Sequence, residues 1–277
     1  MTEPTVAGAV TALFVPGDRP DRFAKAASSG ADVVIMDLED AVAPEMKQAA
    51  LAAVIEALSG PDGLRALVRV NAVGTATYED EITALLALAN HAGHGLAGIV
   101  IPKAEDPVAV QHVGEALPPG LDLVPLIESA AGLVRAFELA AVPAVTRLAF
   151  GAIDFVLDID AEAIDGVLDY VRAQLVIASR AAGVAAPLDS PSVDIRDLER
   201  VRAAARAARS FGFGGKLCIH PAQLGEVAAA FAPTAEDIAW AQRVIGASGG
   251  AVQLDGQMID RPVTDRANRI LVRAGLR

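Results

Sequence analysis

Eight short apolar runs, separated by longer alanine-rich segments, constrain the fold of this 277-residue chain more than any other feature. Most are continuous stretches of Val, Ile and Leu, which is typical of parallel strands covered on both faces. The segments between them carry apolar residues and charges at helical spacing. The runs span residues 11–16, 32–39, 66–71, 98–103, 123–128, 147–154, 185–193 and 216–221.

This alternation predicts an α/β fold, a TIM (β/α)₈ barrel. The alternative is an open, doubly wound sheet. Closure is favoured because eight strands fit into about 220 residues and no Gly-x-Gly-x-x-Gly motif follows the first run. The seventh run holds two prolines and is the weakest of the eight. The barrel is expected to occupy residues 1–245, followed by a C-terminal tail segment and helix at 246–277.

Charge and composition exclude several partners. The net charge of −12 repels phosphate backbones, so no nucleic-acid partner is expected, and a phosphate-bearing ligand would need a local basic pocket. No run reaches the roughly 18 apolar residues of a membrane helix, so no membrane partner is expected either. The single cysteine, Cys218, cannot form an internal disulfide, which fits a cytoplasmic location.

Polar residues stand at or near the end of each run. In a TIM barrel the active site lies at the carboxyl ends of the strands, so these side chains are expected to converge on one rim. One polar strand end is ordinary contact with solvent, but eight together favour a functional site. They are Gly17-Asp18-Arg19, Asp37, Glu39, Asp40, Arg69, Asn71, Lys103, Glu128, Asp154, Asp189 and His220.

Glu128 and Asp154 are the candidate metal ligands. They close the fifth and sixth runs, and neighbouring strands lie about 4.8 Å apart, so both carboxylates can reach one ion. Two carboxylates, with waters and substrate oxygens, suit Mg²⁺, with Mn²⁺ as the alternative. The four histidines lack zinc-ligand spacing. The competing interpretation is a pair of solvated acids or a salt bridge to Arg69.

Arg69 lies within the third run, where an unpaired guanidinium would be costly. Its planar fork suits a substrate carboxylate or carbonyl. The alternative is a structural pair with Asp37 or Glu39, and both arrangements can hold together.

A basic cluster follows the first run in the sequence "GDRPDRFAK", which contains Arg19, Arg22 and Lys25. In an acidic chain this cluster indicates contact with a phosphate or nucleotide, although an ordinary charged helix face is nearly as consistent with it. His220 precedes a proline in an apolar setting and is expected to be a buried structural histidine.

Taken together, the motifs resemble the citrate lyase beta-subunit-like family of acyl-CoA lyases. They occur in the order of the family and cover nearly the whole chain. The motifs are "FVPGDRPDRFAKA", "DVVIMDLEDAVAPEMK", "RVNAVGT", "IVIPKAE", "PLIESAAGL", "FGAIDF", "FGFGGKLCIHPAQL" and "DGQMIDRPV".

The resemblance implies an enzyme that makes or breaks a C–C bond in the CoA thioester of a hydroxy-dicarboxylic or tricarboxylic acid. It also implies Mg²⁺ held by Glu128 and Asp154, a substrate-binding Arg69, and CoA, as part of the substrate, near Arg19 and Lys25. Asp260 in "GQMID" matches an acid that relatives deliver from the tail of a neighbouring subunit, and such relatives form homotrimers or larger homo-oligomers.

From the resemblance, Asp260 is the candidate for proton transfer, with Asp255 as the fallback. Arg69 would hold a carboxylate, and Asp37 would orient Arg69 or the waters of the metal. One departure stands beside the site: Ile153 replaces the acid that the family often carries before Asp154. If residues 147–154 are one strand, alternation turns Ile153 away from the face of Asp154.

Several functions remain open at this stage. A pyruvate-forming aldolase acting on free hydroxy-keto acids would use a similar metal without CoA. A thioesterase, a citrate lyase beta subunit that works only with an acyl carrier protein, and a degenerate barrel used for binding are further alternatives.

Overall fold

The computed structural model describes residues 5–60, 64–162, 164–247, 252–254 and 257–277. These residues form two compact units, Met1–Ala230 and Phe231–Arg277. The first unit contains eight strands in one closed barrel, each parallel to its neighbours, and β1 also pairs with β8. The strands are β1 (Thr11–Pro16), β2 (Val33–Asp37), β3 (Ala66–Arg69), β4 (Leu96–Ile101), β5 (Asp122–Ile127), β6 (Arg147–Phe150), β7 (Ala185–Asp189) and β8 (Gly215–Cys218).

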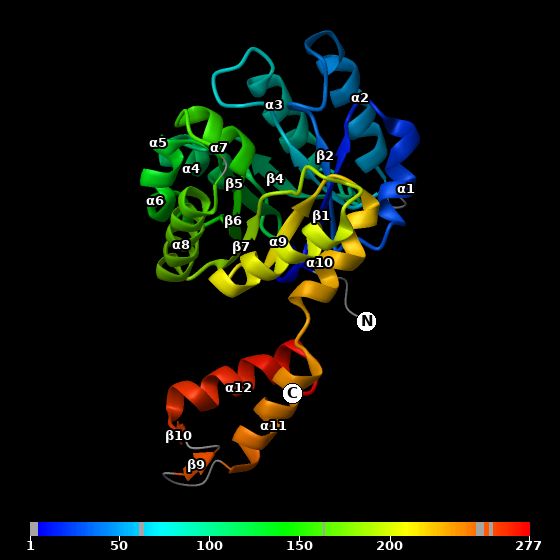
Figure 1. Cartoon of the computed structure of the whole chain (residues 1–277). Helices are drawn as coiled ribbons and strands as arrows, with labels where there is room; N and C mark the ends of the chain where they lie inside the picture. The colour runs from blue at the N-terminus through cyan, green and yellow to red at the C-terminus, as the bar shows by residue number, and fades with distance from the viewer. Residues whose placement is uncertain (1–4, 61–63, 163, 248–251, 255–256) are drawn as a thin grey trace. The chain divides into compact units, whose positions relative to one another are not determined.

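Helices surround this barrel on its outer side (Figure 1). The α-helices of the first unit are α1 (Phe23–Ala27), α2 (Lys47–Leu58), α3 (Tyr78–Ala89), α4 (Pro107–Ala116), α5 (Ala130–Val134), α6 (Ala136–Ala140), α7 (Ala152–Asp158), α8 (Asp165–Ala182), α9 (Leu198–Phe211) and α10 (Leu224–Phe231). Short 3₁₀ helices are η1 (Val6–Gly8), η2 (Pro20–Arg22), η3 (Pro44–Met46) and η4 (Pro221–Gln223). The TIM-barrel prediction, including the weak seventh strand, is confirmed.

Helix α9 illustrates how the local sequence sets these elements. The Asp197 carboxylate caps its first turn by accepting a hydrogen bond from the Arg200 N–H at 3.1 Å. Val201, Ala205 and Ala208 are buried at spacings of four and three residues, which gives one apolar stripe against the barrel. The helix ends at Gly212, whose φ of 105° favours glycine.

The two-residue period of the strands builds the interior of the barrel. Ile35, Leu67, Leu126, Leu188 and Leu217 are all buried in one core cluster. Because side chains alternate between the faces of a strand, the residues two positions further along must also face the interior, nearer the carboxyl ends. The candidate site is therefore expected inside the barrel, at the carboxyl ends of the strands.

Arg147 fills the opposite end of the interior. Its side chain is fully buried, and its guanidinium donates hydrogen bonds to the carbonyls of Val6 and Ala9, at 3.0 and 2.8 Å, and to that of Ala186. Burial lowers its pKa to about 10. Arg147 thereby ties the segment around η1 to the amino-terminal end of the barrel.

The second unit consists of α11 (Ala235–Ala247), β9 (Val252–Leu254), β10 (Gln257–Ile259) and α12 (Arg261–Arg273). The two strands pair antiparallel, and the helices share a core that includes Val244 and Ile270. The unit starts earlier than the expected tail at 246–277, because α11 packs against α12. In the described part of the chain, no helix is long and apolar enough to cross a membrane.

Candidate active site

The carboxyl ends of the strands form a cavity of about 350 Å³ lined by both charged and apolar side chains. Its charged members follow from strand alternation, since Asp37, Arg69 and Glu128 each come two residues after an inward leucine or isoleucine. Asp154 also lines the cavity, so all four predicted barrel residues of the metal and carboxylate site are brought together. The other lining residues are Phe14, Pro16, Asp40, Ala41, Leu126, Gly151, Ile153, Ser190, Pro191, Leu217 and Ile219.

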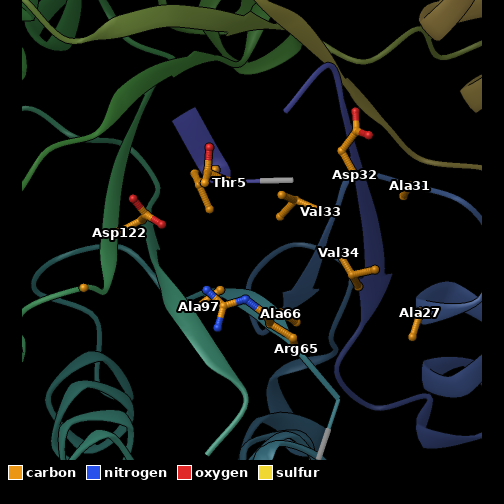
Figure 2. A pocket seen from close by; sticks show the side chains of 12 residues that line it. Thr5, Ala27, Ala31, Asp32, Val33, Val34, Arg65, Ala66, Ala97 and Asp122 are labelled. Carbon is orange, nitrogen blue, oxygen red and sulfur yellow. The ribbon is translucent and has the colours of Figure 1, made fainter. Parts of the chain in front are cut away.

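A larger cavity, of about 600 Å³, lies at the opposite end, where the strands begin (Figure 2). Its two acids, Asp32 and Asp122, stand apart and are already engaged. Asp32 accepts from the N–H groups of Val10 and Thr11, both at 2.9 Å, and Asp122 accepts from the hydroxyl of Thr146. The smaller cavity is therefore the candidate active site, because there ionisable groups converge with a free carboxylate among them.

Three acidic side chains surround the guanidinium of Arg69. Its Nε and Nη2 each lie 2.7 Å from an Asp37 oxygen, while Nη1 lies 2.8 Å from Glu39 and 3.6 Å from Asp40. Burial lowers the pKa of Arg69, but the hydrogen bonds and negative charges of these acids outweigh burial and raise it overall. Both interpretations of Arg69 can therefore hold, since a structural pair to Asp37 sits at the cavity wall.

Glu128 is almost fully buried and accepts a hydrogen bond at Oε1 from the Lys103 main-chain N–H at 2.8 Å. The pKa of Glu128 is raised to about 8, mainly by burial and also by the charges of Glu39 and Asp154, against the opposing effect of Lys103. A Cβ added at Gly151 would lie 2.5 Å from Glu128 Oε2. Glycine at position 151 thus leaves the space that this carboxylate occupies.

The donors fit a divalent cation. No donor in the described part of the chain bonds the Asp154 carboxylate, and its charge acts on Glu128. Hard oxygen ligands on a cavity wall, with room for waters, are what Mg²⁺ requires. The described residues contain no cluster of three or more His, Cys, Asp or Glu arranged to hold a metal, so the protein would supply two carboxylates.

The position of Asp154 corrects the expectation that it closes a strand. Strand β6 ends at Phe150, and Asp154 lies in the first turn of α7. Ile153 therefore does not alternate with Asp154 along a strand, contrary to the prediction, because residues 153 and 154 are successive helical positions. Ile153 is 52% exposed and lines the same cavity as Asp154.

Several predicted rim residues, Asp189 and His220 among them, do not line the cavity. Asp189 follows the inward Leu188 by one position, so it faces outward, where Lys216 Nζ lies 2.6 Å away and Arg172 Nε 3.0 Å away. His220 is exposed, not buried, and its Nδ1 accepts from the Ala222 N–H at 3.1 Å, which caps η4. Both are structural in this arrangement.

Asn71 is a third structural member of the predicted rim. Its main-chain N–H donates to Glu81 Oε2 at 2.7 Å, and its amide donates to Glu81 Oε1 and, at 2.9 Å, to the Leu38 carbonyl. These bonds tie β3 to α3 and to the loop after β2. Asn71 thereby supports the segment that carries Asp37 and Glu39.

The basic cluster separates into two environments. Lys25 and Arg22 line a cavity of about 450 Å³ beside β1, together with His220. Arg19 is not among its lining residues and forms an exposed ion pair with Asp21 at 2.9 Å. Sequence reasoning gave His220 no part in this basic region, although "CIHP" places it directly after β8, the neighbour of β1.

The tail acids lie in the second unit. Asp260 precedes α12, is exposed, and accepts from the Val263 N–H at 3.1 Å. Asp255 lies outside the described residues. The structure also reveals a link that sequence reasoning missed: Lys103, identified only as a strand end, bonds Glu39 at 2.6 Å.

Comparison with known proteins shows the family of the chain. Residues 11–221 match the model of the HpcH/HpaI aldolase/citrate lyase family. The citrate lyase subunit beta-like protein of Mycobacterium tuberculosis H37Rv is 39% identical over 273 residues, which cover 95% of this chain and 94% of that protein. An L-malyl-CoA/beta-methylmalyl-CoA lyase of Cereibacter sphaeroides is 33% identical over 286 residues, covering 90% of this chain and 89% of that protein.

Among solved structures, the CitE protein of M. tuberculosis in complex with magnesium, acetoacetate and coenzyme A is 38% identical. Its TM-score is 0.85, and the match covers 98% of this chain and all of that one. A family model over most of the chain, relatives above 30% identity and a shared barrel all agree. This chain belongs to the HpcH/HpaI aldolase/citrate lyase family.

Proposed function

We propose that this protein is a Mg²⁺-dependent carbon–carbon lyase that cleaves or forms a hydroxy-dicarboxylic or tricarboxylic acyl-CoA thioester. The observation that carries the proposal is the pairing of Glu128 with Asp154, to which no described residue donates a hydrogen bond, on the wall of a cavity that also holds Arg69. The relatives support it, because they include a malyl-CoA lyase and a CitE protein bound to magnesium, acetoacetate and coenzyme A.

In this proposal Glu128 and Asp154 hold the metal, and Mn²⁺ can replace Mg²⁺. When bound, the ion supplies Lewis-acid stabilisation of the keto-acid oxygens. Two structural features hold the metal-binding carboxylates in place. The Lys103 N–H donates a hydrogen bond to Glu128, and the first turn of α7 carries Asp154. The acyl part of the substrate lies against the apolar walls that Phe14, Leu126 and other side chains provide.

Arg69 binds a carboxylate or carbonyl of the acid and stabilises the negative charge that develops there. Asp37 holds the guanidinium in one plane through two hydrogen bonds and so acts on the substrate through Arg69. In cleavage, a base takes the hydroxyl proton, the C–C bond breaks, and the acetyl-CoA enolate is then protonated at carbon. In synthesis, the base removes the thioester α-proton.

Asp260 from the tail of a neighbouring subunit is the proposed proton-transfer group, in a homotrimer or hexamer. The exposed carboxylate of Asp260 is in accord with this role. The CoA part lies along the basic cavity beside β1, where Lys25 and Arg22 contact its phosphates and Arg19 extends the positive surface. A cytoplasmic location is proposed with this function, since CoA thioesters are intracellular metabolites.

The experiment is a cleavage assay of the purified chain with citryl-, malyl-, citramalyl- and methylmalyl-CoA, with Mg²⁺ or with EDTA. A 2-oxo acid and an acyl-CoA should appear in equal amounts, only with metal; the acyl-CoA is propionyl-CoA from methylmalyl-CoA and acetyl-CoA from the other three. Glu128→Gln and Asp154→Asn should abolish this activity, while the control Glu105→Gln, an exposed acid two residues after Lys103, should retain it.

Other outcomes would select the alternatives. Cleavage of free hydroxy-keto acids without CoA would indicate the aldolase, and free CoA with intact hydroxy acid would indicate a thioesterase. Activity only with an acyl-carrier thioester would indicate a subunit of a larger lyase complex. Metal binding without any turnover would indicate a binding barrel.

A further inference from the structure

Lys103 has a backbone conformation that needs an explanation. Its φ is +45°, and among the described residues other than glycine only Asp160 shares a positive φ. The left-handed region costs a lysine on the order of 1 kcal/mol, and such strain persists where the surroundings impose it. Lys103 comes two residues after β4, on the rim of the candidate active site.

In this conformation Lys103 donates hydrogen bonds to two acidic side chains. The Lys103 main-chain N–H donates to Glu128 Oε1 at 2.8 Å, and its Nζ donates to Glu39 Oε1 at 2.6 Å. The same Nζ lies 4.0 Å from Glu128 Oε1. Both carboxylates are shielded from water, with side-chain exposures of 7% for Glu39 and 1% for Glu128. The ammonium therefore lies between two buried carboxyl groups.

On its other side, Glu39 Oε2 lies 2.8 Å from Arg69 Nη1. The charges of the rim thus alternate from Arg69 through Glu39 and Lys103 to Glu128. Without the ammonium, Glu39 and Glu128 would repel each other in a poorly solvated site. Glu39 would then be held by Arg69 alone, and its rotation towards the cation would add a third carboxylate.

We propose that Lys103 is a positioning residue that keeps Glu39 bound to the protein and restricts the cation site to Glu128 and Asp154. The proposal rests on the metal-dependent function above and deepens it, because it concerns which cation the site accepts. A site with two carboxylates and several waters suits Mg²⁺, whereas Ca²⁺ takes six to eight oxygen ligands and gains from an additional carboxylate.

Three substitutions separate charge from backbone strain. Lys103→Met keeps the aliphatic stem and removes the charge. Lys103→Gly removes the charge, keeps the N–H that holds Glu128, and relieves the positive φ. Lys103→Arg restores the charge in a side chain that is 42% exposed and has room for it. The control is Arg135→Met, which removes an exposed cation whose guanidinium donates a hydrogen bond to the Glu105 carbonyl, at 3.4 Å.

The main measurement is calorimetric titration of each apo protein with Mg²⁺ and Ca²⁺, without substrate. The ratio of the Ca²⁺ Kd to the Mg²⁺ Kd should fall about tenfold or more in Lys103→Met and Lys103→Gly, and stay within about threefold of the parent in Lys103→Arg and Arg135→Met. The two charge-removing variants should also lose kcat with Mg²⁺ by about tenfold or more, with little change in KM.

A parent-like ratio in both charge-removing variants overturns the role of Lys103, even if they unfold at a lower temperature, because stability alone would then be affected. A Lys103→Arg variant as altered as Lys103→Met overturns it as well. If the parent protein binds neither ion saturably, the metal-dependent function itself fails, and this proposal fails with it.

Discussion

The guanidinium of Arg69 and the carboxylate of Asp37 form a buried pair with two hydrogen bonds, Nε to Oδ1 and Nη2 to Oδ2, both 2.7 Å long. The two residues are also register partners on β2 and β3. Strand pairing therefore fixes the pair before any ligand arrives. Arg69 presents one defined orientation to the cavity, at no cost of ordering when a substrate binds.

Replacing the guanidinium of Arg69 is expected to affect both catalysis and stability. Arg69→Lys should lower kcat/KM at least about 100-fold, because an ammonium cannot bind Asp37 and a substrate oxygen in the same geometry. The free energy of unfolding should fall by about 1–3 kcal/mol as Asp37 loses a hydrogen bond. Arg65→Lys makes the same chemical change at an exposed position and should match the parent in steady-state kinetics and urea unfolding. A fully active Arg69→Lys protein would contradict the assigned role.

Adding one methyl group at Gly151 should disturb the metal site. The new Cβ would lie 2.5 Å from Glu128 Oε2, so the carboxylate must move. Gly151→Ala should weaken Mg²⁺ binding about tenfold or more in calorimetric titration, and cost about 1–3 kcal/mol of stability from overpacking. Gly166→Ala is the control, since nothing lies within 4 Å of its added Cβ. Unchanged Mg²⁺ affinity in Gly151→Ala would show that Glu128 does not bind the ion.

Mixing two inactive variants tests the proposed exchange of tails between subunits. Glu128→Gln supplies an intact tail, and Asp260→Asn supplies an intact barrel. If Asp260 acts on the neighbouring barrel, co-assembled oligomers should contain complete sites, about a quarter of the total at equal mixing. Lyase activity should then reappear only after co-expression or joint refolding. A mixture that stays inactive, although mass spectrometry shows mixed oligomers, would place the acid on its own barrel or elsewhere.

The pH dependence of stability should report the burial of Cys218. Burial raises the pKa of this thiol from 9.0 to about 12. Above pH 9 the unfolded thiol loses its proton while the folded one keeps it, so the unfolded state binds fewer protons. The free energy of unfolding should therefore fall as pH rises from 9 towards 12, by up to about 1.4 kcal/mol per pH unit from this group.

Urea unfolding at pH 8 and pH 10 measures this contribution when Cys218→Ala is studied in parallel. Other groups titrate in the same range in both proteins, so the difference between the proteins isolates the thiol. The parent should lose more stability than Cys218→Ala between the two pH values. Identical losses would mean that Cys218 is accessible to solvent in the folded protein. Slow reaction of the native thiol with a disulfide reagent at pH 8 provides an independent check.

The candidate site was predictable wherever the sequence shows which residues of a strand face the interior of the barrel. Asp37, Arg69 and Glu128 each follow an inward apolar residue by two positions, and the structure places all three on the cavity wall. The same rule separates Asp189 from Ser190: Leu188 faces inward, so Ser190 lines the cavity and Asp189 faces the outer helices. Because Asp189 comes one position after the inward Leu188, strand alternation alone would have identified it as an outward, structural residue.

The stretch "FGAIDF" could not be resolved in the same way. Its apolar residues fit the end of a strand or the start of a helix, and the strand-to-helix change falls at Gly151. The glycine is there because the carboxylate of Glu128 occupies the space of its side chain. That reason lies on β5, more than 20 residues earlier, and leaves no local signal.

By itself, the sequence determined the barrel and the rim that carries the site, because eight apolar runs with helical segments between them have few ways to bury their faces, and side chains alternate along every strand. Tertiary structure alone decided which polar residues bind each other, as in the left-handed turn of Lys103 and the contacts of Asp189 with Lys216 and Arg172. Such pairings depend on distances between segments far apart in the chain, and periodicity within one segment carries no information about those distances.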